Sequence, residues 1–154
     1  MRIALGSDER TPLTDAVTED LRARGHDVVL VGPPGGRDDQ QWAEVGHRVG
    51  CLVAAGECET GVLFCWTGTG ASIAANKVAG ARAALCTDAA TAAGARKWND
   101  ANVLVMGLRL TSTETAREML EAWFSTAPDP GEAANISSLE TTTLDTARLD
   151  RSED

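Results

Sequence analysis

A cysteine that opens a glycine-rich turn is the feature of this sequence with the clearest capacity for chemistry. It is the last residue of a continuously apolar run over 61–65, which predicts a short buried strand, and it precedes a helical pattern over 72–78. Backbone N–H groups at a helix N-terminus converge on anions, and the positive potential there favours a thiolate. A packed cysteine in a tight turn is the alternative interpretation. The turn reads Cys65-Trp66-Thr67-Gly68-Thr69-Gly70.

The sequence contains no common nucleotide or zinc motif. Ile73 stands where a dinucleotide fingerprint has its third glycine, and no Gly-Lys-Ser/Thr follows, which excludes a Walker loop. The four cysteines form no Cys-x-x-Cys pair and the only histidines are His26 and His47, so we expect no zinc site. We expect free thiols, with Cys51 and Cys86 buried by packing.

Strand and helix patterns alternate along the chain and must position this turn. Thr11-Pro12 caps the first helix, Gly25 ends it, and Thr111-x-x-Glu114 reads as a capping box for the last helix. The glycines and prolines of 32–36 predict a loop. Alternation predicts a mostly parallel sheet covered on both faces. The expected strands are 2–5, 27–31, 61–65, 81–86 and 103–106, and the expected helices are 12–24, 40–55, 72–78, 89–97 and 111–124.

The helix over 40–55 carries apolar residues at helical spacing, which predicts one buried face. Those residues are Trp42, Val45, Val49, Leu52 and Val53. In open α/β sheets ligands bind at the carboxyl ends of strands. The loops 6–9, 65–70 and 106–109 should therefore share one crevice, which would gather Asp8, Glu9 and Arg109 around Cys65.

The length and net charge of the chain limit the number of domains and the kinds of partner that we expect. The chain has 154 residues with 43% apolar content, which suits one compact domain over 1–126. Residues 127–154 form a polar extension, in which we expect a short helix near 136–144 and a frayed acidic end. The net charge of −9 argues against a nucleic-acid partner and against an anionic membrane surface. No run of 18 uncharged apolar residues occurs and the chain opens on a strand pattern, so we expect a cytoplasmic protein.

Three segments of the chain carry a recognisable pattern: Gly61 to Lys77, Gly80 to Cys86 and Asn99 to Leu104. Together they resemble the type B ribose-5-phosphate isomerase and galactose-6-phosphate isomerase family. The resemblance runs from Ile3 to about Trp123 and implies a Rossmann-like three-layer α/β/α sandwich with a five-stranded mostly parallel sheet. It also implies a homodimer, with pairing into tetramers left open, a small sugar or sugar phosphate as substrate, and neither metal nor organic cofactor.

The resemblance also implies roles for individual residues. Cys65 is the base that moves a proton between C2 and C1 through an enediolate, and Thr67 with the amides near Gly68 stabilises the oxyanion. Asp8 assists ring opening or holds a hydroxyl, with Glu9 beside it as a further acid–base group. Asn99 is expected to reach across the dimer interface. The remaining substrate contacts implied are Gly70, Ser72, Trp98, Arg109 and Arg10.

The sequence also departs from the family pattern. Glu9 and Trp98 stand where the family has histidines, and Asp39 aligns with a tyrosine that lines the sugar site. No Lys or Arg occurs between Arg117 and Arg148, where the family brings arginines to the phosphate. Losing paired guanidinium groups removes charge-assisted hydrogen bonds, so we expect a substrate other than ordinary ribose 5-phosphate, unless Arg10 compensates.

Three functions fit these residues. The first is an aldose–ketose isomerase with a cysteine base, acting on an unphosphorylated or otherwise modified sugar. The second is a non-catalytic sugar-binding relative, which would explain the lost histidines but not the retention of Cys65 beside Thr67. The third is an epimerase that uses the same enediolate.

Overall fold

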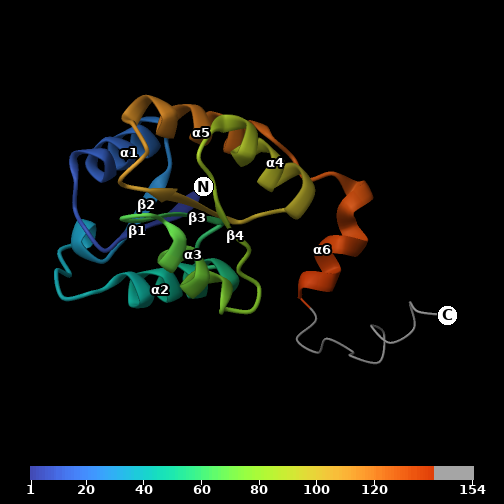
Figure 1. Cartoon of the computed structure of the whole chain (residues 1–154), viewed down its shortest axis with the longest axis horizontal. Coiled ribbons are helices and arrows are strands. Elements are labelled where there is room, and N and C mark those ends of the chain that lie inside the picture. Colours follow the sequence, from blue (N-terminus) through green and yellow to red (C-terminus); the bar gives the residue numbers. More distant parts are fainter. Residues whose placement is uncertain (141–154) are drawn as a thin grey trace.

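The computed structural model describes residues 1–140, and its centre is one sheet of five parallel strands (Figure 1). Their order across the sheet is β2-β1-β3-β5-β4, and every pairing is parallel. The prediction of a mostly parallel sheet is confirmed. The strands are β1 (Arg2–Ser7), β2 (Asp27–Val31), β3 (Thr60–Cys65), β4 (Ala83–Leu85) and β5 (Val103–Gly107).

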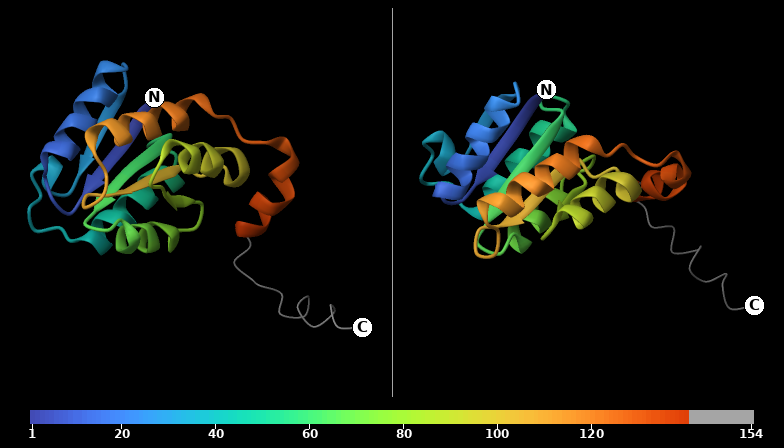
Figure 2. Two further views of the ribbon diagram at one scale, coloured as in Figure 1. Left: turned by 45° about the horizontal axis from the view of Figure 1, so that its top comes forward. Right: turned by 90° about the horizontal axis from the view of Figure 1, so that it is seen from above.

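Helices cover both faces of the sheet, which gives the expected three layers (Figures 1 and 2). One face carries α1 (Pro12–Ala23), α4 (Ala89–Asn99) and α5 (Thr113–Ser125). The other face carries α2 (Trp42–Ala54) and α3 (Thr69–Asn76). The short helix α6 (Ala133–Leu139) stands away from the sheet on the α4 side, as both figures show.

The core has two halves because successive strand residues point to opposite faces. Leu5 and Phe64 are fully buried under α1, α4 and α5. Leu63 and Val105 are fully buried under α2 and α3. Buried on both faces, the central strands read as continuous apolar runs in the sequence, which is why their type was predictable.

The two helices α2 and α3 approach unusually closely, because glycines face the contact. A Cβ on Gly46 would lie 2.6 Å from the carbonyl oxygen of Ala71, and one on Gly50 would lie 3.0 Å from another carbonyl oxygen of α3. Trp42 is one turn before Gly46 on the same stripe of α2, since residues four apart share a helix face. The glycine stripe therefore fixes where Trp42 lies relative to the start of α3.

Several local predictions were wrong in detail. The capping box at Thr111 does not form, because Ser112 is the N-cap of α5 and accepts a hydrogen bond from the backbone N–H of Thr115 at 3.1 Å. The predicted loop over 32–36 contains a single 3₁₀ turn, η1 (Pro33–Gly35). A second such turn, η2 (Pro130–Glu132), precedes α6.

Other predicted helix boundaries were confirmed or differ from the structure by a few residues. The cap at Thr11 is confirmed, since its hydroxyl accepts from the backbone N–H of Thr14. Helix α3 begins at Thr69 rather than near 72, inside the glycine-rich turn itself. The helix expected near 136–144 overlaps α6, although 141–144 and the predicted frayed end lie outside the described residues.

Candidate active site

The order of the strands places the candidate site between β1 and β3. The chain leaves β1 to build β2 on one side and then crosses to β3 on the other, so the strand order reverses there. Open α/β sheets bind ligands at such a reversal, outside the carboxyl ends of the strands. Ser7 pairs with Phe64, and Cys65 pairs with Gly107. Loops 6–9, 65–70 and 106–109 thus begin side by side, as predicted.

A pocket of about 310 Å³ lies at this edge of the sheet. Its volume is at the lower end for small-molecule sites, the size of a single sugar rather than of a dinucleotide. It contains four of the residues that the sequence singled out: Asp8, Cys65, Thr67 and Gly70. The full lining is Asp8, Trp42, Cys65, Trp66, Thr67, Thr69 and Gly70.

Cys65 is the last residue of β3, and only 5% of its surface is exposed. Its carbonyl oxygen accepts a hydrogen bond from the N–H of Leu108 at 3.0 Å, so the ladder to β5 holds its backbone. All four cysteines are free, as expected. Burial raises the pKa of Cys86 to about 11, and that thiol lies in a different groove. Cys51 is half-buried beside His47 rather than fully packed.

The turn after Cys65 depends on glycine at 68. Gly68 has φ +80°, in the left-handed region, and a Cβ there would lie 2.5 Å from Cδ1 of Leu85. It is the N-cap of α3 and brings no side chain to cap the first turn, which leaves N–H groups of that turn for a ligand. The hydroxyls of Thr67 and Thr69 lie 2.8 Å apart and line the pocket.

Asp8 supplies a carboxyl group with an unused oxygen. Its Oδ1 is buried and has no hydrogen-bond partner within the described residues. Burial raises the pKa of Asp8 above its ordinary value of 3.8, a hydrogen bond from its own backbone N–H opposes this, and the nearby charge of Glu9 adds to it. An orphaned buried acceptor is rare in folded proteins, and here it belongs to a residue that lines a pocket.

Four other predicted contacts do not line this pocket. The side chain of Glu9 is exposed, while its backbone N–H donates to Ser7 Oγ at 3.2 Å. Arg10 is exposed and paired with Asp15 at 2.9 Å. Ser72 is half-buried on α3, outside the lining. Arg109 is exposed, yet its backbone N–H donates to the carbonyl oxygen of Trp66 at 2.9 Å, which keeps it at the rim.

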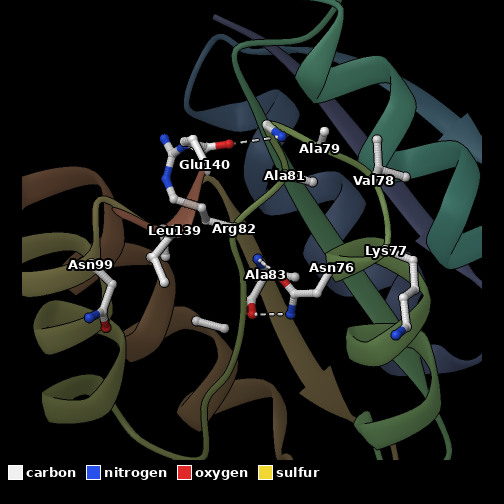
Figure 3. Close-up of a pocket in the computed structure, with 13 residues that line it drawn as sticks. Asn76, Lys77, Val78, Ala79, Ala81, Arg82, Ala83, Asn99, Leu139 and Glu140 are labelled. Atoms are coloured by element: carbon white, nitrogen blue, oxygen red, sulfur yellow. Dashed lines mark hydrogen bonds and ion pairs between the residues drawn. The ribbon is translucent and has the colours of Figure 1, made fainter. Parts of the chain in front are cut away.

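Trp98 and Asn99 lie at the end of α4, away from the thiol pocket. Asn99 lines a larger cavity of about 550 Å³ between α3, β4, α4 and α6, where it faces Asn76 and Lys77 across the gap (Figure 3). The one carboxyl group in that lining, Glu140, already pairs with Arg82. Of the two, the smaller pocket combines a thiol with a carboxyl group that has an unpartnered oxygen, although the larger cavity has more room.

Two tryptophans at the site were missed as site residues. Trp42 was predicted to lie on the buried face of its helix, but 46% of it is exposed and it lines the pocket, so that expectation was wrong. Asp39, at the position that the resemblance gives to a tyrosine, is exposed, pairs with Arg37 at 3.4 Å and does not line the pocket. The signal for Trp42 was its place on the stripe with Gly46, which faces α3 rather than the sheet.

Neither a cluster of metal ligands nor a membrane-spanning helix occurs in the described part of the chain. No group of three or more His, Cys, Asp or Glu side chains there is placed to hold a metal ion. No helix within 1–140 is long and apolar enough to cross a bilayer. The side chains that line the 310 Å³ pocket carry thiol, carboxyl, hydroxyl and indole groups.

A parallel α/β sheet with a thiol and a carboxyl at its strand reversal defines a small-molecule site suited to acid–base chemistry. Residues 3–138 match the family model described as Ribose/Galactose Isomerase. The chain belongs to this family of isomerases, which confirms the family predicted from the sequence.

Individual relatives agree with this assignment. D-erythrulose-4-phosphate isomerase of Pectobacterium atrosepticum is 33% identical over 87% of this chain and 89% of its own. Ribose-5-phosphate isomerase B of Escherichia coli is 35% identical over 84% and 87%. The structure of ribose-5-phosphate isomerase B from Clostridium thermocellum matches with a TM-score of 0.84 and 33% identity, over 91% of this chain and 95% of that one.

Replacing Asp8 with asparagine should raise stability at neutral pH while lowering activity. The folded-state pKa lies above the unfolded value, so wild-type stability falls as pH rises through that interval, and the amide escapes this cost. Because Asp8 is only partly buried, solvent screening reduces this difference, so we expect a gain of at most about 1 kcal/mol at pH 7 that shrinks as pH falls toward 4. Urea unfolding across this pH range measures it.

The matched control is Glu19→Gln, which changes an exposed carboxyl group on α1. It should stay within about 0.5 kcal/mol of wild type at every pH. A loss of stability in Asp8→Asn at pH 7 would mean that the carboxylate has a favourable partner in solution, contrary to the orphaned Oδ1.

Proposed function

We propose that this protein is an aldose–ketose isomerase acting on a small sugar or sugar phosphate through an enediolate, with Cys65 as the base. The observation that carries the proposal is that one sugar-sized pocket is lined by both Cys65 and Asp8, whose buried Oδ1 has no partner within the described residues. Membership of an isomerase family supports the reaction class. The four free thiols support a reducing, cytoplasmic compartment.

In the proposed reaction the thiolate of Cys65 removes the proton from C2 of the open-chain aldose. The carbonyl oxygen at C1 takes up a proton and an enediol forms. The proton then leaves the hydroxyl at C2, the thiol returns its proton to C1, and the ketose results with no net oxidation. Each proton removed is returned, so no cofactor is consumed.

The turn around Gly68 would stabilise the charge that develops on the substrate oxygens. The uncapped N–H groups at the start of α3 and the hydroxyl of Thr67 are the available donors. Donors fixed before the reaction cost no reorganisation, and removal of one typically lowers kcat by a factor of about 10²–10³. The proposed oxyanion donors and the proposed base would then belong to one turn, residues 65–70.

Asp8 would exchange a proton with the sugar during ring opening. Burial favours its neutral form, and a neutral carboxyl group can donate a hydrogen bond as well as accept one. This supports a role for Asp8 where the family pattern uses histidine at the next position. Glu9, exposed beside it, would influence the site through its charge rather than by contact.

Substitution of Cys65 by serine or alanine should abolish turnover. General acid–base catalysis is worth a factor of about 10²–10⁴, so kcat should fall by at least 10². The fold should be retained, because the side chain is small and ends a strand whose ladder uses only its backbone. Turnover is followed in deuterated water, where an isomerase or an epimerase incorporates deuterium into the sugar and a binding protein does not.

Cys51→Ser is the control, since this half-buried thiol on α2 lies outside the pocket. It should keep the wild-type rate. Near-wild-type exchange in Cys65→Ser would remove Cys65 from the mechanism. An epimer as the product, rather than a ketose, would reassign the reaction to an epimerase with the same base.

We further propose that this isomerase discriminates only weakly in favour of phosphate. None of the described residues that line the pocket is Lys, Arg or His, and its one ionisable carboxyl group would repel a dianion when charged. Arg10 is paired with Asp15, so we propose Arg109, whose backbone N–H donates to the carbonyl oxygen of Trp66, as the cation that contacts an anionic group. The two relatives named above carry phosphate substrates in their names, so this proposal is specific to the present chain.

For matched sugars with and without phosphate, we expect kcat/KM to differ by less than about tenfold, equivalent to roughly 1.4 kcal/mol. Arg109→Ala should remove most of what preference there is, and Glu9→His should increase it. Arg22→Ala, an exposed arginine on α1, is the control and should change neither value. A preference of 10³ or more for ribose 5-phosphate that needs Arg10 or Arg109 would contradict the proposal.

A homodimer in solution is the assembly that we propose, with Asn99 reaching the site of the partner. Support comes from the exposed apolar side chains of Trp98 and Leu139, which flank the edge strand β4. Light scattering at micromolar concentration should give about twice the chain mass of 16.1 kDa. Trp98→Glu should shift the protein toward monomers. A clean monomer for the unmodified chain would count against this assembly.

A further inference from the structure

Two of the largest side chains in the protein line the thiol pocket without being buried. Trp42 is 46% exposed and Trp66 is 58% exposed. The chain contains six aromatic residues in all, four Trp and two Phe, so this one small pocket uses a third of them. Exposed aromatic groups that converge on one cavity mark a surface that a ligand covers.

The position of Trp42 is fixed by the packing beneath it. A Cβ on Gly70 would lie 2.8 Å from the six-membered ring of the Trp42 indole, so only glycine allows this ring to rest on the first turn of α3. The close contact of Gly46 with α3 holds the next turn of α2 against the same helix. The indole is therefore held in place before any ligand arrives, which lowers the entropic cost of binding.

The position of Trp66 is fixed through its backbone. Its carbonyl oxygen accepts a hydrogen bond from the N–H of Arg109 at 2.9 Å, directly beyond the bond that Cys65 makes to Leu108. The indole thus follows the catalytic thiol by one residue on a paired segment. The backbone of both tryptophans is therefore held in place, next to the groups that would carry out the chemistry.

The rest of the lining has little charge with which to bind a sugar. Asp8 is its only carboxyl group, and no Lys, Arg or His among the described residues reaches it. The hydroxyls of Thr67 and Thr69 are partly used on each other. Affinity for the carbon chain must come largely from apolar contact, and the C–H faces of a sugar fit the negative face of an indole ring.

We propose that Trp42 and Trp66 form an aromatic wall that binds the carbon chain of the substrate through its C–H bonds. This inference rests on the proposed function for the identity of the ligand as a sugar. It makes the two tryptophans substrate-binding groups that set affinity for neutral polyhydroxy compounds. They touch no bond that is made or broken, so their removal should raise KM and leave kcat nearly unchanged.

The test uses ribitol and erythritol, which carry the carbon chain and hydroxyls of a sugar but cannot be isomerised. Their binding to the full-length protein is followed by the indole N–H signals in NMR. The signals of Trp42 and Trp66 should shift on titration. The signal of Trp123, whose indole is buried and donates to Thr60 Oγ1, should stay in place.

Variants then separate aromatic contact from simple apolar bulk. Trp42→Leu and Trp66→Leu should raise the Kd for ribitol about three- to tenfold, whereas Trp42→Phe and Trp66→Phe should change it less than about twofold. Thermal unfolding of each variant checks the fold. If Trp42→Leu disturbs the start of α2, the exposed Trp66 still provides the test, because its side chain is not part of the core.

Equal Kd values in the Leu and Phe variants would overturn the aromatic wall, as would the absence of saturable alditol binding by the unmodified protein. A change of oligomeric state in Trp66→Leu without a change in Kd would also overturn it, by assigning that indole to a protein contact. The proposed function fails separately. Ribitol binding with the expected variant pattern, but without isomerase turnover, would keep the wall and reject the isomerase.

Discussion

The parallel register of β1 on β3 pairs Ser7 with Phe64, so that the next residue of each strand, Asp8 and Cys65, emerges at the same edge of the sheet. No helix or loop could bring these two groups together as rigidly, because each strand is held by ladders on both sides. The register of β3 on β5 adds Gly107 beside Cys65. Hydrogen bonds of the sheet thus determine the geometry of a site whose side chains make few contacts with one another.

The site carries local costs that this rigid sheet can support. Asp8 keeps a buried oxygen without a partner, and Gly68 holds a conformation that other residues adopt only with strain. Both lie within two or three residues of a paired strand. Such costs persist in proteins where the surrounding structure determines them and where a ligand removes them. The orphaned oxygen of Asp8 therefore supports the proposal that this residue acts on a substrate.

The sequence predicted the strands well because their burial on both faces leaves unbroken apolar runs, as in 61–65. It also predicted that Asp8 and Cys65 would share a crevice, since parallel strands end at one edge. The sequence could not place Trp42, because helical spacing of apolar residues predicts a buried face without saying whether that face packs on the sheet or on α3. Only the contact of Gly46 with Ala71, between distant segments, decides between these faces.

The thiol pocket has an aromatic lining and little positive charge, and both features affect which ligand it prefers. With an acidic residue at Glu9 and no Lys, Arg or His among the described residues that line the thiol pocket, a ligand gains little from carrying negative charge there. The same lining gives it two indole faces instead. Selection among sugars would then depend on how much of the carbon chain lies on those faces, and less on its terminal group. Under the proposed mechanism, a chain of this family keeps its thiol and its glycine-rich turn while the residues that select the substrate change around them.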